Sequence, residues 1–286
     1  MSHGFPHPIP PLPIAQLLRQ AGLHPKKRLG QNFLQDPHLL EAIVQSAEIS
    51  PTDWVLEIGP GLGSLTRYLA NAARQVVAVE IDDALFQILE QVLAPWENVQ
   101  LVRGDILRLS PADLIQVEDY LVVANIPYYI TSAVIRHLLE APRRPRRMVL
   151  TVQKEVAERI CAQPKEMNLL ALSVQVYGHP SVVLRIPAGS FYPMPKVDSA
   201  VVRLDLYRQP YLADECLETF FRLIHAGFSQ KRKTLRNALA HGLGVNTPQV
   251  ETLLLQAGID PQRRAETLSL DEWGQLVNAW KTRWEK

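Results

Sequence analysis

Cysteine and long apolar runs are scarce in this sequence. The chain has 286 residues and only two cysteines, Cys161 and Cys216, which lie far apart with no C-x-x-C spacing. This argues against a disulfide framework or a zinc site and is typical of a reducing compartment, so we expect a cytoplasmic protein. No apolar run approaches the roughly 20 residues that cross a bilayer, so no membrane association is expected. The N-terminus lacks a basic start followed by an apolar core, which excludes a secretory signal.

The overall composition excludes intrinsic disorder as the main state of the chain. Hydrophobic residues make up 47% and charged residues 21%, which is ordinary for a protein that buries a sizeable core. The length favours one large domain with a small appendage, and nothing in the sequence indicates an oligomer, so we expect a monomer. The histidines His24, His38, His137 and His179 have no metal-ligand spacing, and we expect no metal site.

The net charge of +1 hides an uneven distribution along the chain. Residues 41–125 contain 13 acidic and 4 basic side chains and carry −9, so the rest of the chain carries +10. The basic residues form three clusters, which are Lys26, Lys27 and Arg28; Arg143, Arg144, Arg146 and Arg147; and Lys231, Arg232, Lys233 and Arg236. Any one cluster is explained as a solvated face. The three clusters together favour binding of a polyanion such as nucleic acid, whereas the acidic segment favours a cationic small molecule at a different place.

Apolar periodicity divides the chain into three segments. Residues 1–22 are predicted as a flexible N-terminal tail, because five of the first thirteen residues are proline, although positions 14–21 have a helical pattern. Residues 23–207 alternate apolar runs with amphipathic helices and are predicted as an α/β domain. Residues 208–286 have helical periodicity and are predicted as a small all-helical domain.

The central segment is predicted to form a doubly wound, mostly parallel sheet. Asp36 and Pro37 are expected to begin a helix ahead of it. The expected strands are 54–58, 76–79, 99–103, 120–124 and 148–152, and the alternating helices are 65–73, 84–93, 131–139 and 155–161. Three further strands, 169–177, 181–186 and 197–206, favour a hairpin addition at one sheet edge. The expected C-terminal helices are 217–227, 231–240, 248–257 and 270–284.

A glycine-rich turn follows the first of these strands. Gly59, Gly61 and Gly63 have the spacing G-x-G-x-G, and glycines let a ligand approach the backbone where a Cβ would clash. Such a turn alone can simply reverse the chain. Glu80 after the second strand can accept hydrogen bonds from both ribose hydroxyls, and Asp105 after the third can meet the amino group of an adenine. The acidic surroundings disfavour a pyrophosphate and suit the sulfonium of S-adenosylmethionine (SAM).

A second turn of chemical interest follows the fourth strand at Asn125, Ile126, Pro127 and Tyr128. The Asn125 amide oxygen and the Ile126 carbonyl can both accept hydrogen bonds from one amino group. Accepting both hydrogens would favour a pyramidal nitrogen and stabilise the charge that develops during methyl transfer. Pro127 fixes the turn, and Tyr128 can stack on a flipped base. A rigid surface turn is the alternative for these residues taken alone.

These segments resemble the rRNA adenine N6-dimethyltransferase family, most closely its bacterial small-subunit branch. The segments that carry the resemblance are 27–34, 57–61, 125–128, 153–156, 191–201, 228–237 and 264–269. They span nearly the whole chain, and together they are specific. The chain departs from many bacterial members at Ile126, where they have Leu, but the functional group at this position is the backbone carbonyl.

The resemblance implies a Rossmann-like SAM-dependent methyltransferase without a covalent intermediate. The residues it places at the cofactor, with their neighbours, are Gln31, Asn32, Leu34, Gly59, Gly61, Glu80, Ile81, Asp105, Ile106 and Asn125. It makes Asn125 serve both cofactor and target, and it places the target adenine between Tyr128 and Phe191. Residue chemistry alone cannot choose Phe191 over Tyr192 or Tyr129 as the second aromatic partner.

The resemblance also gives the basic clusters a partner, which is 16S rRNA within the small ribosomal subunit. It implies two methyl groups on each of two adjacent adenosines near the 3′ end, added late in subunit assembly. Lys231, Arg232, Lys233 and Arg236 are expected at a helix start, where they can contact phosphates. For the loop 143–147, a role in RNA binding and a role in solubility remain equally open.

Two alternative functions are kept. One is the related large-subunit adenine methyltransferase that confers macrolide resistance, which shares the cofactor pocket and the catalytic turn. The segment 228–237 and the long helical tail favour the small-subunit branch. The other is a ribosome-assembly or RNA-binding factor that retains the fold without catalysis. The intact glycine turn, Glu80 and the Asn125–Tyr128 turn favour an enzyme.

Overall fold

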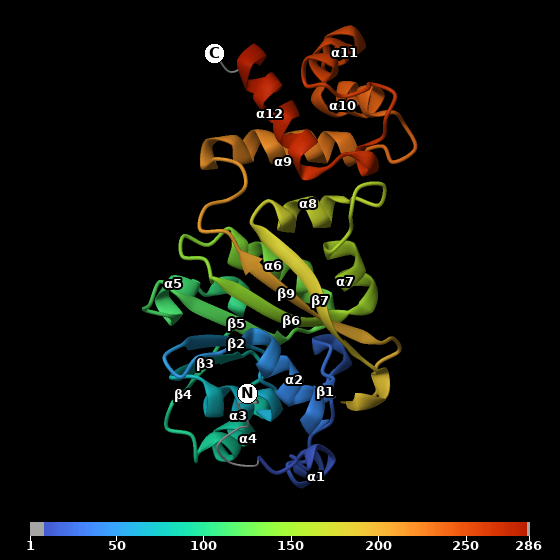
Figure 1. Ribbon diagram of the computed structural model, residues 1–286. Helices are drawn as coiled ribbons and strands as arrows, with labels where there is room; N and C mark the ends of the chain where they lie inside the picture. The colour runs from blue at the N-terminus through green and yellow to red at the C-terminus, as the bar shows by residue number, and fades with distance from the viewer. Residues whose placement is uncertain (1–8, 285–286) are drawn as a thin grey trace. The chain divides into compact units, whose positions relative to one another are not determined.

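The computed structural model describes residues 9–284, which form two compact units (Figure 1). One unit comprises the described residues up to Ala157 together with Pro180–Leu206. The other comprises Glu158–His179 and the described residues from Tyr207 onward. Residues 158–179, which we expected in the α/β domain, therefore pack with the C-terminal helices. Within the described range, no helix combines the length and apolar content needed to cross a membrane.

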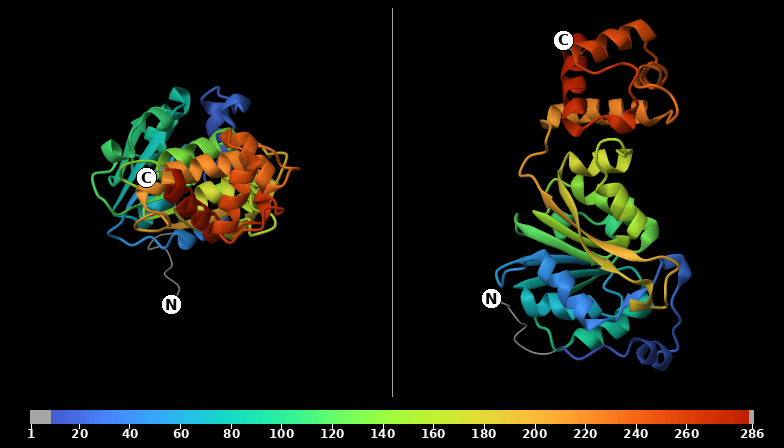
Figure 2. Two further views of the ribbon diagram at one scale, coloured as in Figure 1. Left: turned by 90° about the horizontal axis from the view of Figure 1, so that it is seen from above. Right: turned by 45° about the vertical axis from the view of Figure 1, so that its right-hand side comes forward.

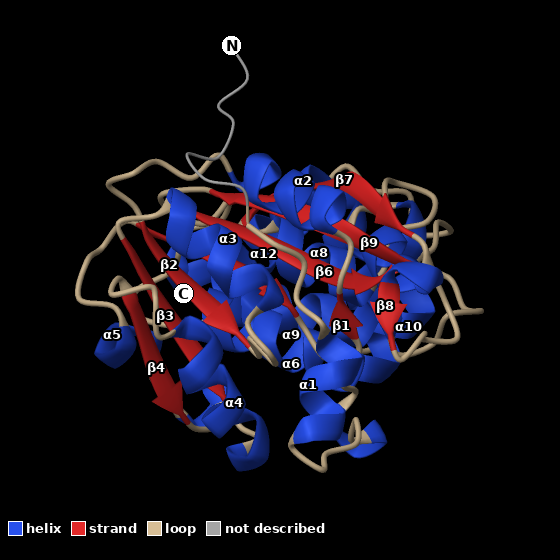
Figure 3. Cartoon of the chain, turned by 90° about the horizontal axis from the view of Figure 1, so that it is seen from below, coloured by secondary structure: helices blue, strands red, loops and turns tan. Residues whose placement is uncertain are grey.

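The first unit is built on a mostly parallel sheet. Its strands, in spatial order, are β4 (Val99–Arg103), β3 (Gln75–Glu80), β2 (Trp54–Ile58), β5 (Tyr120–Asn125), β6 (Arg147–Gln153), β9 (Ser199–Leu206) and β7 (Gly178–Ile186). The first five are parallel to one another, and β9 is antiparallel to β6. Figure 3 shows this order from β4 at one edge to β7 at the other. The predicted fold class is confirmed, as are two of the three further strands expected at the edge, 181–186 and 197–206.

Apart from α5, which was not predicted, the helices of this unit occupy the positions that the apolar periodicity predicts, and α7 continues beyond Ala157 into the second unit. They are α1 (Ile14–Gln20), α2 (Pro37–Ala47), α3 (Ser64–Ala72), α4 (Asp83–Leu93), α5 (Pro111–Leu114), α6 (Thr131–Leu139) and α7 (Lys154–Ile160). Short 3-10 turns are η1 (Lys27–Leu29), η2 (Ile106–Arg108), η3 (Tyr128–Ile130) and η4 (Ala188–Ser190). Asp36 caps α2 as expected, because its side chain accepts hydrogen bonds from the backbone N–H groups of His38 and Leu39.

The core lies between α2, α3 and one face of the sheet. Buried residues of α2 such as Ile43 and of α3 such as Leu69 share a cluster with Val55, Val76 and Val149 of the strands. Successive strand residues point to opposite faces, so the alternate positions, which are also apolar, bury the other face of the sheet. The continuous apolar runs in the sequence are therefore explained by burial on both faces.

The prediction of a flexible tail over residues 1–22 is wrong for residues 9–22, and the first eight lie outside the described residues. Ile14 and Leu18 of α1 are buried in a cluster with Phe33, Leu62 and Leu85. Their spacing of four residues places both on one helix face, and burial of this face outweighs the proline-rich composition. The proline count therefore underestimated the order of this segment.

A second correction concerns residues 169–177, which were predicted as a strand. They contain helix α8 (Leu169–Gln175), whose first turn is capped by the Asn168 side chain. Ser173 also donates a hydrogen bond to the Leu169 carbonyl one turn earlier. The short apolar run was ambiguous between strand and helix, and the Asn168 cap was the overlooked signal.

A two-stranded ladder lies apart from the main sheet in the first unit. Strands β1 (Phe33–Leu34) and β8 (Phe191–Tyr192) are antiparallel, with Leu34 opposite Phe191 (Figure 3). Neither strand was predicted, because two residues carry too little periodicity to be recognised. The ladder joins segments that are far apart in the chain.

The second unit is helical, and its C-terminal helices are coloured orange to red in Figure 2. Besides α8 it contains α9 (Asp214–Phe228), α10 (Leu235–Leu243), α11 (Thr247–Gln256), η5 (Ala265–Thr267) and α12 (Leu270–Trp284). The ring of Tyr177 beyond α8 stacks on Phe221 of α9, with centroids 6.4 Å apart. This contact explains why the segment around α8 belongs to the helical unit.

A substitution at Gly227 tests the packing of the second unit. Glycine normally destabilises a helix by about 1 kcal/mol relative to alanine. Here a Cβ would lie 2.5 Å from Cη2 of Trp273, which is fully buried. We expect Gly227→Ala to lower the free energy of unfolding by about 1–3 kcal/mol, because a packed indole cannot yield. Urea unfolding followed by circular dichroism measures this, with Gly189→Ala, which meets nothing within 4 Å, as the control. Unchanged stability would contradict this packing.

Candidate active site

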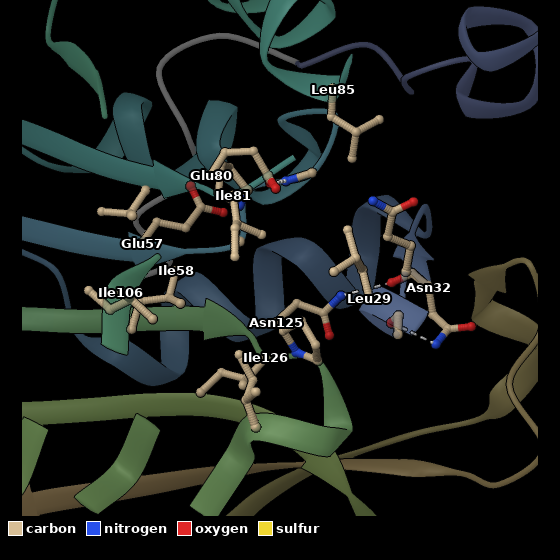
Figure 4. A pocket seen from close by; sticks show the side chains of 18 of the residues that line it. Leu29, Asn32, Glu57, Ile58, Glu80, Ile81, Leu85, Ile106, Asn125 and Ile126 are labelled. Atoms are coloured by element: carbon tan, nitrogen blue, oxygen red, sulfur yellow. Dashed lines mark hydrogen bonds between the residues drawn. The ribbon is translucent and has the colours of Figure 1, made fainter. Parts of the chain in front are cut away.

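A cavity of about 340 Å³ opens where the parallel strands end (Figure 4). The loops after β2, β3, β4 and β5 line it, together with residues 29–34. Ligands of doubly wound sheets bind at this edge. Every residue predicted to bind the cofactor lines it, namely Gln31, Asn32, Leu34, Gly59, Gly61, Glu80, Ile81, Asp105, Ile106 and Asn125. The acidic segment 41–125 supplies most of this set.

Gly61 is the point of closest approach in the glycine turn. Its φ of +62° lies in the left-handed region, and a Cβ there would be 2.9 Å from the Phe33 ring. Glycine is therefore required twice, by backbone conformation and by the aromatic ring that packs on it. The glycine turn and the segment around Phe33 are therefore packed directly against each other.

Glu80 is buried, yet both oxygens of its carboxylate are hydrogen-bonded. Oε2 accepts from the Gly61 backbone N–H at 3.0 Å and Oε1 from the Asp82 N–H at 2.8 Å. Burial raises the pKa of Glu80 above its ordinary value, and the two backbone donors oppose this rise. Each carboxylate oxygen can accept a further bond, so this geometry can receive a pair of ligand hydroxyls.

The other end of the cavity suits a flat apolar ring with a polar edge. Ile106 is buried and Ile81 is exposed, and both line the cavity (Figure 4). Asp105 begins the 3-10 turn η2, and its Oδ1 accepts from the Leu107 N–H at 3.0 Å. Its carboxylate remains partly exposed at the cavity.

The catalytic turn is oriented by a residue from the N-terminal segment. Asn125 donates a hydrogen bond from Nδ2 to the backbone carbonyl of Asn32 at 3.0 Å (Figure 4). This bond determines which way the amide faces, so Oδ1 of Asn125 is left as an acceptor. Ile126 and Pro127 follow in the cavity wall. The turn therefore presents acceptors rather than donors to a ligand.

Tyr128 and Phe191, predicted as the two stacking partners, have different surroundings. Tyr128 lines the cavity, and its hydroxyl is 2.7 Å from Oγ of Ser199 on β9. Phe191 is only 3% exposed, lies in the core cluster and does not line the cavity. Tyr129 and Tyr192 are the exposed aromatic rings nearby in sequence. The expected contact of Phe191 with a target base stays a prediction.

Glu57 is a cavity residue to which the sequence reasoning assigned no role. It lies in β2, is 1% exposed, and its Oε2 has no hydrogen-bond partner within the described residues. Burial, assisted by the nearby charge of Glu80, raises the pKa of Glu57 to about 8. The available signal was an acid inside an otherwise apolar strand, since such a residue is costly to bury.

The loop 143–147 leads into β6, so it lies where the parallel strands begin. The cavity lies at the other end of these strands, where they finish. Arg146 forms an ion pair with Asp53 at 2.8 Å, and Arg147 pairs with Asp205 and with Glu48. Arg143 donates to the Ile115 carbonyl at 2.7 Å. The partners of Arg146 and Arg147 lie before β2, after α2 and near the end of β9, and the partner of Arg143 lies after α5. These contacts give the three arginines a structural role at the end of the sheet away from the cavity.

Two other predicted RNA ligands are also engaged within the protein. Lys26 forms an ion pair with Asp82 at 2.6 Å, and Arg236 pairs with Glu251 at 3.0 Å. The remaining residues of their clusters are exposed, namely Lys27, Arg28, Lys231, Arg232 and Lys233. The last three lie in the turn between α9 and α10, not in a helix as predicted, since α10 begins only at Leu235.

Comparison with known proteins decides the family. The model of the family described as "Ribosomal RNA adenine dimethylase" matches residues 22–282. The chain belongs to this family. Its members methylate adenine in ribosomal RNA, so the predictions of family and of enzyme class are confirmed. The match extends through both structural units.

Individual relatives agree with this assignment. "Ribosomal RNA small subunit methyltransferase A" of Dehalococcoides mccartyi is 49% identical over 255 residues, covering 89% of this chain and 88% of the relative. The protein of the same name from Moorella thermoacetica is 44% identical and covers 91% and 94%. A dimethyladenosine transferase from Plasmodium falciparum has a TM-score of 0.76 at 27% identity, covering 87% and 98%. The 23S rRNA methyltransferase ErmE has a TM-score of 0.72 at 31% identity, covering 87% and 99%.

The raised pKa of Glu57 predicts a pH-dependent effect on stability. The unfolded side chain titrates near 4.5 and the folded one near 8, so the folded protein binds more protons between these values. This contribution is complete below pH 4.5 and is lost as the pH rises through 8. Glu57→Gln cannot ionise, and we expect it to be more stable than the wild type at pH 8 by more than about 1 kcal/mol, with the difference shrinking toward pH 5.

Thermal unfolding of the two proteins across this pH range measures the effect. Glu90→Gln, which alters an exposed acid, is the control and should follow the wild type at every pH. A difference between Glu57→Gln and the wild type that stays constant with pH would contradict the buried, protonated state.

Proposed function

We propose that the chain transfers methyl groups from SAM to N6 of two adjacent adenosines near the 3′ end of 16S rRNA, dimethylating each. It does so in the cytoplasm, late in assembly of the small ribosomal subunit. The observation that carries the proposal is the orientation of Asn125. Its Nδ2 is committed to the Asn32 carbonyl, which leaves Oδ1 to accept a hydrogen from the amino group of a target base.

The residues of the cavity fit SAM. Glu80 offers carboxylate oxygens for ribose hydroxyls, and Asp105 with Ile81 and Ile106 offers an acidic edge and apolar contacts for adenine. Gly61 brings backbone close to the ligand without a Cβ. The acidic side chains of Glu80 and Asp105 at the cavity favour a ligand with positive charge over a pyrophosphate. SAM, when bound, would supply an electrophilic methyl group on its sulfonium, and breaking that S–C bond would leave S-adenosylhomocysteine as the other product.

The chemical step depends on how the chain holds the nucleophile. An adenine amino group is a poor nucleophile because its lone pair is delocalised into the ring. Oδ1 of Asn125 and the backbone carbonyl of Ile126 accept its two hydrogens, which favours a pyramidal nitrogen and stabilises the positive charge that develops on it. Tyr128, anchored through its hydroxyl to Ser199, stacks on the base and holds it in line with the methyl group.

The choice of the small subunit rests on the relatives. Those at 41–49% identity carry the small-subunit name, whereas ErmE, which acts on 23S rRNA, is 31% identical. Both kinds of enzyme need the same cofactor cavity and catalytic turn, so the RNA target must be decided by assay. Radiolabelled methyl transfer to separated, undermethylated small and large subunits, followed by mapping of the modified bases, tests the choice. Label only in the large subunit would overturn it.

The role of Asn125 predicts a selective loss of catalysis. Asn125→Ala removes an acceptor needed as charge develops, and we expect methyl transfer to fall by at least about 100-fold. The affinity for SAM, measured by calorimetry, should change by less than about tenfold, because most cavity contacts remain. Turnover close to that of the wild type would contradict the proposed role.

RNA binding is proposed for the exposed basic residues only. Lys27 and Arg28 belong to the sheet unit, and Lys231, Arg232 and Lys233 belong to the helical unit. Exposed lysine and arginine side chains bind phosphates mainly by releasing counterions, so the affinity depends on salt. Arg143, Arg146, Arg147 and Arg236 are left out of this surface, because their guanidinium groups hold partners within the chain.

Charge reversal in the helical unit tests this surface. Replacing Lys231, Arg232 and Lys233 by Glu should weaken binding to small-subunit rRNA at least about tenfold and reduce the salt dependence, with the slope of log affinity against log salt falling by about two. The control makes the same replacement by Glu at Arg159, Lys165 and Arg208, which are three exposed basic residues of the same unit. Equal effects of both triple variants would show that only net charge matters.

A further inference from the structure

Asp82 is a buried carboxylate that binds two residues of the N-terminal segment. It follows β3 by two residues and is only 4% exposed. Oδ1 accepts a hydrogen bond from Lys26 Nζ at 2.6 Å, and Oδ2 accepts one from Gln31 Nε2 at 2.7 Å. Burial opposes ionisation, but these two bonds hold the pKa of Asp82 below its ordinary value. The Asp82 carboxylate is therefore ionised, and both of its oxygens accept hydrogen bonds.

The same contacts close residues 26–31 into a ring. The Lys26 backbone N–H donates to Oε1 of Gln31 at 2.8 Å, so the two ends of the ring are bound to each other and to one carboxylate. The 3-10 turn η1 lies between them. Asp82 also accepts from the Ala84 N–H at 3.1 Å and so caps α4. The ring is thus tied to a helix start beside Glu80.

The chain that leaves this ring forms one wall of the active site. Gly30 packs against the catalytic turn, where a Cβ would lie 3.4 Å from Pro127. Asn32 supplies the carbonyl that orients Asn125, and Phe33 packs on Gly61. At its C-terminal end, this segment is held by the two-residue antiparallel ladder that β1 forms with β8.

We propose that Asp82, Lys26 and Gln31 form a latch that holds residues 26–34 over the cofactor cavity and so sets the affinity for SAM. Lys26 is then a positioning residue for the cofactor site and not a ligand of RNA, although it stands beside the exposed Lys27 and Arg28. The identity of the cofactor rests on the function proposed above. The latch itself rests on the contacts of Asp82.

Matched variants of adjacent lysines separate the two roles. Lys26→Met removes the ammonium partner of Asp82, and Lys27→Met makes the same change at the exposed neighbour. Asp82→Asn removes the charge, and asparagine caps a helix as well as aspartate does. We expect Lys26→Met and Asp82→Asn each to weaken SAM binding about tenfold or more, because each breaks a charge-assisted hydrogen bond. Lys27→Met should leave SAM binding unchanged and weaken only RNA binding.

Calorimetry with SAM and the full chain, without RNA, measures the cofactor affinity. The double variant of Lys26 and Asp82 should be little worse than either single variant, because both act on one contact. The SAM Michaelis constant should rise more than kcat falls, a split that a general loss of fold would not produce. Equal, small effects of Lys26→Met and Lys27→Met on SAM, with equal losses in RNA binding, would overturn the proposal.

Trypsin cleavage tests the latch without any ligand. Lys27 and Arg28 lie within the ring, and Asp82→Asn should increase cleavage after them severalfold relative to the wild type. Unchanged cleavage would count against the latch even if SAM binding fell. A wild type that binds SAM but does not methylate small subunits would overturn the proposed RNA target and leave the latch standing.

Discussion

The parallel alignment of β2, β3, β4 and β5 is the constraint on which the active site depends. Because these strands run in one direction and are in register, the residues that follow them meet at one edge of the sheet. The glycine turn, Glu80, Asp105 and Asn125 are separated along the chain, yet all line one cavity. Acids at this buried edge are costly, and backbone N–H groups of the neighbouring turns offset the cost at Glu80.

The sheet edge alone does not complete the site. Residues 29–34 come from a segment ahead of the first parallel strand and contact the glycine turn, the catalytic turn and β8. The hydrogen bond from Asn125 to Asn32 joins residues 93 positions apart. An asparagine amide can turn either face to a ligand, and this bond selects the face that accepts hydrogens. The orientation of the Asn125 amide therefore depends on the N-terminal segment being in place.

Burial separates basic residues that look alike in the sequence. Lys26 and Lys27 are adjacent, but one contacts a buried carboxylate and the other is exposed. Arg146 and Arg147 bind Asp53 and Asp205 at the end of the sheet away from the cavity, whereas Lys231, Arg232 and Lys233 are exposed between two helices. A guanidinium already bonded to a carboxylate would have to give up that bond to bind a phosphate. Clusters of positive charge thus divide into residues that carboxylates hold and residues that stay exposed only after folding.

The sequence by itself determined the alternating fold, the family and the residues that line the cavity at the strand ends. Apolar periodicity is local, the acids and glycines stand close to strand ends, and the order of these features is visible along the chain. Four things required the tertiary structure: the order of residues 9–22, the helix at 169–175, the burial of Phe191, and the partners of Lys26 and the loop 143–147. Each depends on contacts between residues distant in the chain. These contacts form only when helices and strands pack together, so the local sequence does not specify which apolar or charged side chains make them.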